Sequence, residues 1–203
     1  MRLSIFLLGT LFLFACGKSD VKDPVNGPDL SLLPTEDAKK SIPAQAETII
    51  RALQQQDFDE LAAMVHPEKG LCFSPEVSVE KHHHSFPSEA VKMLWNDQRD
   101  YFWGIQSGSG DSILVPFQNY YAAFVYDADY ATSDSVYFNT DHQYGNAHNN
   151  LRQAYPQSVV VEYYEPPQEE QYGGMDWSAL RLVFEPYEDD WRLTGIVHAA
   201  WTP

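Results

Sequence analysis

A histidine close to a carboxylate is the first arrangement in this sequence that could transfer a proton. His66 and Glu68 are separated by one residue, and Lys69 follows them. An imidazole titrates near neutral pH, so beside a carboxylate it could serve as a general acid or base. These residues also stand where a helix is expected to end, and positive charge is favoured at a helix C-terminus. His66 and Lys69 could therefore simply cap helix carbonyl groups, which is the interpretation we favour.

Two further segments have the composition of binding sites but not the spacing. His82, His83 and His84 are consecutive, and adjacent side chains on one loop rarely converge on a metal ion, which needs three or four ligands. The segment 107–110, Ser-Gly-Ser-Gly, lacks the Lys-Ser/Thr pair of a phosphate-binding loop, and Asp111 would repel phosphate. We expect an exposed loop and a turn here, with no metal site and no cofactor.

Two residues in the C-terminal third complete the catalytic candidates with His66. His198 lies between Val197 and Ala199 in a predicted strand, and Asp176 precedes Trp177. Either side chain could act as a base if it faced a cavity. A histidine on a mostly apolar strand is more often a hydrogen-bonded structural residue, and that interpretation is kept beside the catalytic one.

Aromatic side chains are the candidates for binding a ligand. Tryptophan and tyrosine combine a large apolar surface with one hydrogen-bonding group, so they frequently line binding pockets. Such residues also fill hydrophobic cores, and their types alone do not separate the two roles. The candidate ligand-binding residues are Trp103, Tyr120, Tyr121, Trp177 and Trp201.

Helices are predicted mainly in the first half of the folded region. Apolar residues at helical spacing predict a first helix of about 14 residues, with Ser41 as its N-cap and Pro43 in its first turn. Asp57 followed by Glu60 has the capping-box spacing, so a second short helix should begin there. Further helices are expected over 88–95 and 116–125.

Strands dominate the second half. They are predicted over residues 71–74, 100–106, 158–164, 178–186 and 190–201, the last two forming a hairpin. Alternation in this hairpin predicts one buried face, with the other face wetter. The buried face would carry Leu180, Leu182 and Phe184 opposite Trp191, Leu193, Gly195 and Val197. Helices first and antiparallel strands later indicate an α+β fold with helices packed on one face of a curved antiparallel sheet.

The N-terminus has the pattern of an export signal. Arg2 precedes an apolar run of roughly 13 residues, which is shorter than the ~20 needed to span a bilayer. The segment 13–16, Leu-Phe-Ala-Cys, resembles the lipobox of bacterial lipoproteins, although Phe14 is larger than usual at its position. The resemblance implies cleavage after Ala15 and lipid attachment to Cys16, which would anchor the chain firmly in a membrane.

Composition adds a limit on partners and a domain scheme. The formal charge is −16, and loss of Arg2 with the signal would make it −17, so nucleic acid is not expected as a partner. Residues 17–41 have little apolar content and predict a flexible tether. The scheme is a signal peptide at 1–15, a lipidated cysteine with its tether at 16–42 and a folded domain at 43–203.

Two segments of that domain resemble the nuclear transport factor 2-like superfamily, a cone-shaped α+β fold shared with ketosteroid isomerase. They are the helical stretch 46–61 and the closing hairpin 180–201. Other segments, including 65–75 and 174–184, resemble secreted bacterial proteins and lipoproteins of unknown function. Isomerase-type activity would need a carboxylate base near a tyrosine and a protonated acid in one cavity. Tyr120, Tyr121, Glu162, Asp176 and His198 are the candidates, but no family motif maps onto them.

The leading expectation is a lipid-anchored cell-envelope protein whose cone-shaped domain binds a small apolar ligand or a protein partner without catalysis. It would lie at the outer membrane in a cell with two membranes, and otherwise in the outer leaflet of the plasma membrane. The main alternative is an isomerase, dehydratase or hydrolase that uses His66, Asp176 or His198. A structural accessory whose acidic surface meets a basic partner is a third.

Overall fold

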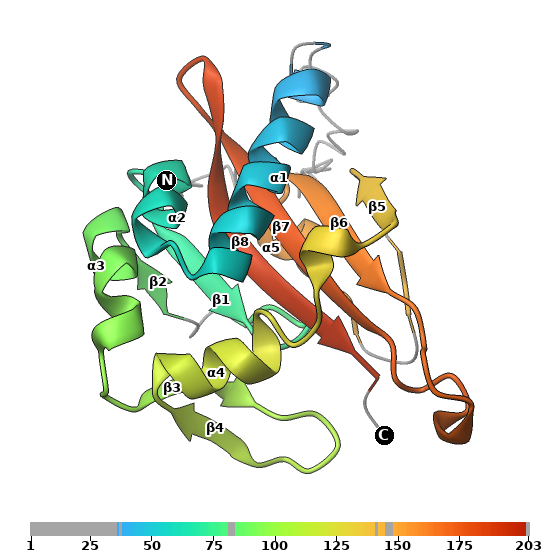
Figure 1. The fold of residues 1–203 in the computed structure, drawn as a ribbon. Coiled ribbons are helices and arrows are strands. Elements are labelled where there is room, and N and C mark those ends of the chain that lie inside the picture. Colours follow the sequence, from blue (N-terminus) through green and yellow to red (C-terminus); the bar gives the residue numbers. More distant parts are fainter. Residues whose placement is uncertain (1–35, 37, 81–83, 141, 145–147, 202–203) are drawn as a thin grey trace, which may run out of the picture. The chain divides into compact units, whose positions relative to one another are not determined.

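The computed structural model describes residues 36, 38–80, 84–140, 142–144 and 148–201. They belong to one compact unit, Pro34–Pro203. Its architecture is α+β, with helices packed on a curved mixed sheet (Figure 1), so the predicted class is confirmed. Cys16, the predicted signal peptide, most of the predicted tether and the pair His82 and His83 lie outside the described residues.

The main sheet has six strands in the order β2-β1-β8-β7-β6-β5. All neighbours are antiparallel except β1 and β8, which are parallel, so the prediction of a purely antiparallel sheet was wrong on this point. These two strands are far apart in the sequence, so no hairpin forces them to be antiparallel. The strands are β1 (Leu71–Ser74), β2 (Ser85–Phe86), β5 (Ser135–Phe138), β6 (Val159–Glu165), β7 (Ser178–Tyr187) and β8 (Asp190–Ala200); β3 (Tyr101–Ile105) and β4 (Ser112–Val115) form a separate hairpin.

The first helix begins earlier than predicted. Ser41 is not its N-cap but lies inside α1, which spans Ala38–Gln55 and also contains Pro43. Ala38 and Ile42 are buried, so the apolar helical spacing continues upstream into the segment assigned to the tether. The other helices are α2 (Phe58–Met64), α3 (Ser88–Met93), α4 (Phe117–Phe124) and α5 (Leu151–Ala154), with 3₁₀ turns at Leu94–Asn96, Tyr130–Thr132 and Glu170–Tyr172.

The predicted cap of α2 is confirmed. The Asp57 carboxylate accepts a hydrogen bond from the backbone N–H of Glu60 at 3.0 Å. This bond satisfies one of the N–H groups that a helix leaves open at its first turn. The cap thus separates α2 from α1 and lets both helices pack on the sheet.

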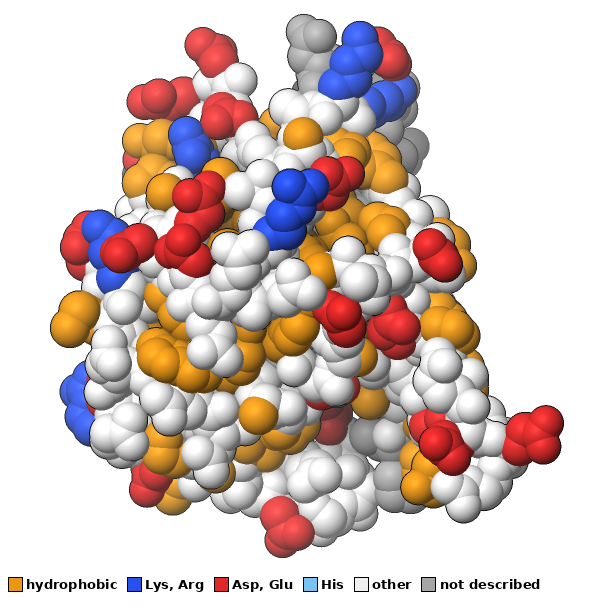
Figure 2. All heavy atoms as spheres, viewed as in Figure 1, with side chains coloured by type: hydrophobic (Ala, Val, Ile, Leu, Met, Phe, Trp, Pro, Cys, Tyr) orange, Lys and Arg blue, Asp and Glu red, His pale blue; other side chains and the backbone are white. Residues whose placement is uncertain are grey.

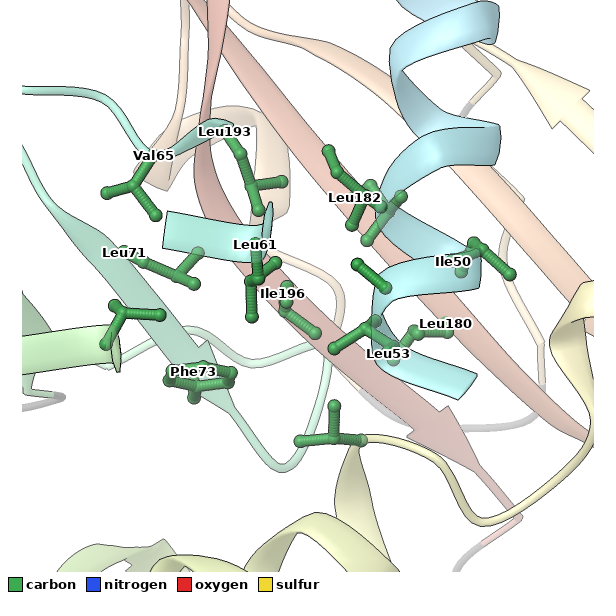
Figure 3. Packing of buried hydrophobic residues seen from close by; sticks show 14 of the residues in the cluster. Ile50, Leu53, Leu61, Val65, Leu71, Phe73, Leu180, Leu182, Leu193 and Ile196 are labelled. Atoms are coloured by element: carbon green, nitrogen blue, oxygen red, sulfur yellow. The ribbon is translucent and has the colours of Figure 1, made fainter. Parts of the chain in front are cut away.

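The larger core lies between the sheet and α1, α2 and α4. Figure 3 shows Ile50 and Leu53 of α1 beside Leu180 and Leu182 of β7. Each of these four side chains is at most 1% exposed. Burial of such side chains contributes about 1.5–3 kcal/mol each, so this face supplies most of the driving force for folding.

The sheet face opposite the larger core, which we call the second face, is also buried. The prediction from alternation that this face is the wetter one was wrong. Every residue of β7 from Ser178 to Glu185 is buried. The cause is a second layer of chain, because α5 and the segments around it cover this face. Leu151 of α5 packs with Val160, Val183 and Val197 from three neighbouring strands.

A bulge in β8 also changes which of its side chains share a face. Phe184 pairs with Leu193 and Val183 pairs with Gly195, so Thr194 is an extra residue in the ladder. Leu193 and Ile196 therefore face the larger core, whereas Val197 faces the second layer. The predicted shared face of Leu193, Gly195 and Val197 is wrong for this reason.

On the face seen in Figure 2, Asp and Glu side chains are spread among polar and apolar ones. Of the helices that the structure describes, none has the length and apolar character needed to cross a membrane.

Candidate functional site

A pocket opens where β1 leaves the sheet. The ladder between β1 and β8 ends at the pair Ser74 and Val197, and Pro75 follows. Proline has no N–H to continue the ladder. The last residues of β8, from His198 onward, therefore lose their neighbour on that side and line a pocket of about 200 Å³.

Segments distant in the sequence form the walls of this pocket, which we call the β8 pocket. One wall comes from α4 and the residues after it, another from the segment that covers the second face. The lining residues are Pro75, Glu76, Val77, Gln106, Ala123, Phe124, Asp127, His142, Gln143, Tyr144, Asn149, Trp177, Arg181 and the stretch 198–201. Such a mixture of aromatic and convergent polar groups is typical of small-molecule sites.

His198 lies in this wall in a fixed orientation. Its Nε2 is 3.1 Å from the Asp127 carboxylate, and its Nδ1 is 3.2 Å from the Pro75 carbonyl oxygen. Both partners are acceptors, so both hydrogen bonds form only when each ring nitrogen carries a proton. The Tyr130 hydroxyl donates to the other Asp127 oxygen at 2.7 Å and lies 3.0 Å from the Ser178 hydroxyl.

The Asp127 carboxylate is stabilised in its charged form. Burial raises its pKa, but hydrogen bonds from His198 and Tyr130, together with the charge of His198, outweigh burial, so the pKa lies below its ordinary value. The side chain of Asp127 is 23% exposed and that of His198 only 5%. The pair is thus a hydrogen-bonded contact at the edge of the pocket.

A second polar cluster surrounds Glu162. Its carboxylate accepts from Arg181 Nε at 2.5 Å and from the Tyr144 hydroxyl at 2.8 Å, and it lies 2.8 Å from His142 Nδ1. Arg181 Nη2 donates to the His142 carbonyl oxygen at 2.7 Å. Both Arg181 and Glu162 are 3% exposed. This cluster fixes the segment 142–144 against the second face of the sheet.

Aromatic rings form one side of the pocket. The Tyr144 ring stacks on Tyr164 with centroids 4.8 Å apart, and it lies 5.0 Å from the Trp177 ring. Desolvation raises the pKa of Tyr144, and its hydrogen bond to Glu162 raises it further, so the hydroxyl stays protonated as a donor. The wall therefore combines flat apolar surface with a fixed polar edge.

Glu76 also lines the pocket, and its hydrogen bonds explain the conformation of the segment 107–110. Ser107 donates to the Glu76 carboxylate through its backbone N–H at 2.6 Å and through its hydroxyl. The segment forms a turn, as predicted. A carboxylate occupies the donors that a phosphate would need, which fits the absence of phosphate-loop spacing.

His66 is distant from this pocket in the fold and does not line it. The ring is 2% exposed, and its Nδ1 accepts hydrogen bonds from the backbone N–H groups of Glu68 and Lys69 at 3.2 Å each. His66 Nδ1 therefore accepts hydrogen bonds from the turn after α2. The capping interpretation required His66 to donate to helix carbonyl groups, so it was wrong. Lys69 pairs with Glu185 at 2.8 Å. These contacts hold His66 in the turn and do not direct its ring into a cavity.

Asp176 likewise holds a turn. Its carboxylate accepts from the backbone N–H groups of Gln168 and Glu169 at 2.9 and 2.8 Å. Burial raises the pKa of Asp176, but these backbone hydrogen bonds outweigh it and lower the pKa below its ordinary value. Of the three catalytic candidates, only His198 lies in the β8 pocket.

The five aromatic candidates separate into two groups. Trp177 and Trp201 line the β8 pocket, and Trp201 is 40% exposed. The other three lie in the core. Trp103 stacks on Tyr120 at 4.1 Å and donates to the Val115 carbonyl oxygen, while the Tyr121 hydroxyl donates to the Leu53 carbonyl oxygen. These three belong to the packing between α4 and the sheet.

Within the described ranges, no group of three or more His, Cys, Asp or Glu side chains is arranged to hold a metal ion. His84, the one described residue of the histidine run, lies against the rings of Phe86 and Tyr101.

Asp127, His142 and Arg181 are among the residues of the site that were not found from the sequence. The first two lie in loops whose position depends on the tertiary fold. Arg181 did carry a signal, because it stands between Leu180 and Leu182 in an apolar strand, as Glu162 does in the preceding one. Opposite charges in two adjacent buried strands indicate a cross-strand ion pair.

The chain matches no family model and no curated protein. We therefore infer its function from the geometry of the β8 pocket and from the sequence patterns described above.

Proposed function

We propose that this is a lipid-anchored cell-envelope protein whose folded domain binds a small ligand in the β8 pocket without catalysing a reaction. The observation that carries the binding role is the pocket itself. It has a volume of about 200 Å³, and the aromatic rings of Tyr144 and Trp177 lie beside fixed polar groups. Pockets with this combination hold a ligand by apolar contact and orient it by a few hydrogen bonds.

The environment of His198 supports binding over catalysis. A general base needs one ring nitrogen free to take a proton from a substrate. In His198, one nitrogen faces the Pro75 carbonyl oxygen and the other faces Asp127. Its two hydrogen bonds leave His198 suited to shaping the pocket.

The anchor and the location rest on the sequence around Cys16. A lipid on that residue would hold the domain at the outer membrane of a cell with two membranes, or in the outer leaflet of a single plasma membrane. An acidic chain of formal charge −16 is a poor partner for nucleic acid. Another envelope protein is the remaining alternative occupant of the pocket.

We also assign the domain to the nuclear transport factor 2-like fold as part of this proposal. Support comes from the N-terminal helix pair, α1 and α2, on one face of a curved sheet that closes with the hairpin β7–β8. In this domain the helix-covered face is filled by side chains such as Trp103 and Tyr120. The proposed ligand therefore binds at the edge of β8, and not beneath the helices.

The direct test is to recover the ligand. The full chain is purified from membranes of its own cells, denatured, and the released small molecules are identified by mass spectrometry. Ala123→Trp should abolish recovery, because Ala123 is exposed on α4 and lines the pocket, so a bulky ring there blocks the pocket at little cost to the fold. Ala122→Trp is the matched control, since its exposed position is adjacent but does not line the pocket. Equal recovery from both variants, or none from the unmodified chain, would contradict the proposal.

Catalysis in the same pocket is a second candidate, favoured by one observation. Glu162 lies 2.8 Å from His142 Nδ1, which is how a carboxylate orients a catalytic imidazole and leaves Nε2 as the basic nitrogen. An isomerase, dehydratase or hydrolase would use His142 in this way. If the recovered compound is converted at the same rate by the unmodified chain and by His142→Gln, catalysis by this residue is excluded.

A further inference from the structure

Arg181 lines the β8 pocket, and one of its nitrogens has no hydrogen-bond partner among the residues that the structure describes. Its Nε donates to Glu162 and its Nη2 donates to the His142 carbonyl oxygen, at 2.5 and 2.7 Å. The remaining nitrogen, Nη1, is buried and donates to no residue within the described ranges. An unpaired buried donor on a charged group is costly, so a ligand that supplies an acceptor to Nη1 would gain affinity.

The two pocket carboxylates are already engaged. Glu76 accepts two hydrogen bonds from Ser107, and Asp127 accepts from Tyr130 and pairs with His198. A cationic ligand would therefore have to displace internal donors before either carboxylate could receive it.

The charge balance disfavours an anionic ligand as well. Glu162 is 3% exposed and neutralises Arg181 from within hydrogen-bonding distance. A ligand carboxylate at Nη1 would place a second negative charge beside Glu162 in a buried environment, where like charges repel strongly. The open donor therefore suits an uncharged acceptor better than a charged one.

The pocket walls indicate the rest of the ligand. Trp177 is 9% exposed and packs in a small apolar cluster with Val77 and Ala199, and the Tyr144 ring lies against this cluster. Flat aromatic rings stack on such walls in offset or edge-on geometry. A ring-sized molecule matches the pocket volume of about 200 Å³.

We propose that the β8 pocket selects an uncharged aromatic molecule with a carbonyl oxygen, such as an amide, and that this oxygen accepts a hydrogen bond from Arg181 Nη1. The inference rests on the proposed binding function and specifies its ligand class. The aromatic ring lies against Trp177 and Tyr144, and the oxygen satisfies the open donor.

Three probes of one shape test this selection. The full chain is titrated by calorimetry with benzamide, benzoate and benzylamine, which are uncharged, anionic and cationic. Benzamide should bind at least about tenfold more tightly than the other two, the difference that one hydrogen bond to a charged donor supplies. Binding of benzoate or benzylamine at equal or higher affinity would overturn the inference, and so would binding of none of the probes.

Variants locate the binding and separate this inference from the proposed function. Arg181→Lys keeps the charge beside Glu162 but loses the fork of donors, so benzamide affinity should fall by roughly 10- to 100-fold. Ala123→Trp should abolish binding and Ala122→Trp should not. If Arg181→Lys binds benzamide normally while its circular dichroism matches the unmodified chain, Nη1 is not the donor. Should the probes fail while a small molecule is still recovered from the cell-purified chain, the ligand class is wrong and the binding function stands.

Discussion

Single charged residues fix the geometry of the β8 pocket. Arg181 and Glu162 form an ion pair that is 3% exposed on both sides, and Glu162 also holds Tyr144 and His142. Removing one partner of a buried pair leaves an uncompensated charge, which costs more than the pair itself contributes. The free energy of unfolding should therefore fall further when one partner of the pair is replaced than when both are.

Arg181→Met is expected to lower the free energy of unfolding by roughly 3–5 kcal/mol, because Glu162 stays buried and charged. The double variant Arg181→Met/Glu162→Gln should lose less than this single variant. Arg192→Met is the control, since Arg192 pairs with Asp190 near the surface and such pairs contribute about 0–1 kcal/mol. Chemical denaturation of the three variants measures the difference; equal losses for Arg181→Met and Arg192→Met would contradict it.

Asp127 should make stability depend on pH in one direction. Its pKa is lowered in the folded protein, so the folded state holds the carboxylate more strongly than the unfolded state does. The resulting stabilisation is present above the ordinary aspartate pKa of about 3.9 and is lost as the pH falls through the lower folded pKa.

Asp127→Asn is therefore expected to lower stability at neutral pH by about 1 kcal/mol and to lose less on acidification. Urea denaturation of both proteins, from neutral pH to about pH 2, gives the two curves. They should converge at the acidic end. Curves that stay parallel over the whole range would show that Asp127 does not contribute in this way.

At the scale of elements, the bulge in β8 positions the pocket. The extra residue Thr194 shifts the register, so that His198 shares the face of Leu180 and Val197 turns to the second layer. Gly195, the residue after the bulge, lies close to Tyr155 and Val183. A Cβ there would lie 3.1 Å from the Tyr155 hydroxyl and 3.2 Å from the Val183 Cβ.

Gly195→Ala should consequently overpack the second layer and cost about 1–3 kcal/mol. Tyr155→Phe removes the hydroxyl nearest to the new methyl group, so the double variant should recover part of the loss. Thermal unfolding of the single and double variants measures this coupling. A double variant less stable than the sum of both single effects would argue against the contact.

Much of the secondary structure could be predicted from local patterns, and the deviations have identifiable causes. The cap at Asp57 and the hairpin β7–β8 were found because a few neighbouring residues determine them. The register after Thr194 was not, since a bulge leaves no mark in apolar alternation. The burial of both faces of β7 depends on α5, whose four residues carry too little periodicity to be noticed.

At the scale of the whole molecule, the pocket could not be derived from sequence for a related reason. Its walls come from six separate parts of the chain, and only the tertiary fold brings Asp127, Arg181 and His198 to one place. Trp177 and Trp201 were found by residue type, but the same criterion selected Trp103, which packs in the core. Residue type indicates that a side chain could bind a ligand, but burial in the fold decides whether it lines a pocket or packs in the core.

The proposed lipid anchor gives a prediction at the same scale. If Cys16 carries acyl chains, Cys16→Ala should shift the protein from the membrane fraction to the soluble fraction, because each buried methylene contributes about 0.8 kcal/mol to membrane binding. Cell fractionation with mass spectrometry of the N-terminal peptide measures both location and modification. Cys72→Ala, which replaces the other cysteine of the sequence, is the control, and it should stay in the membrane fraction. Equal distribution of Cys16→Ala and the unmodified chain would contradict lipid anchoring.

The most direct test of ligand binding at the β8 pocket is fluorine NMR of the full chain labelled with 5-fluorotryptophan. Each resonance is assigned by a Trp→Phe variant, and the small-molecule extract of the protein's own cell envelope is then added. Binding at the pocket should shift the resonances of Trp177 and Trp201, which line it, and leave that of Trp103 in the core unchanged. Unchanged resonances of Trp177 and Trp201, or a response centred on Trp103, would contradict the account.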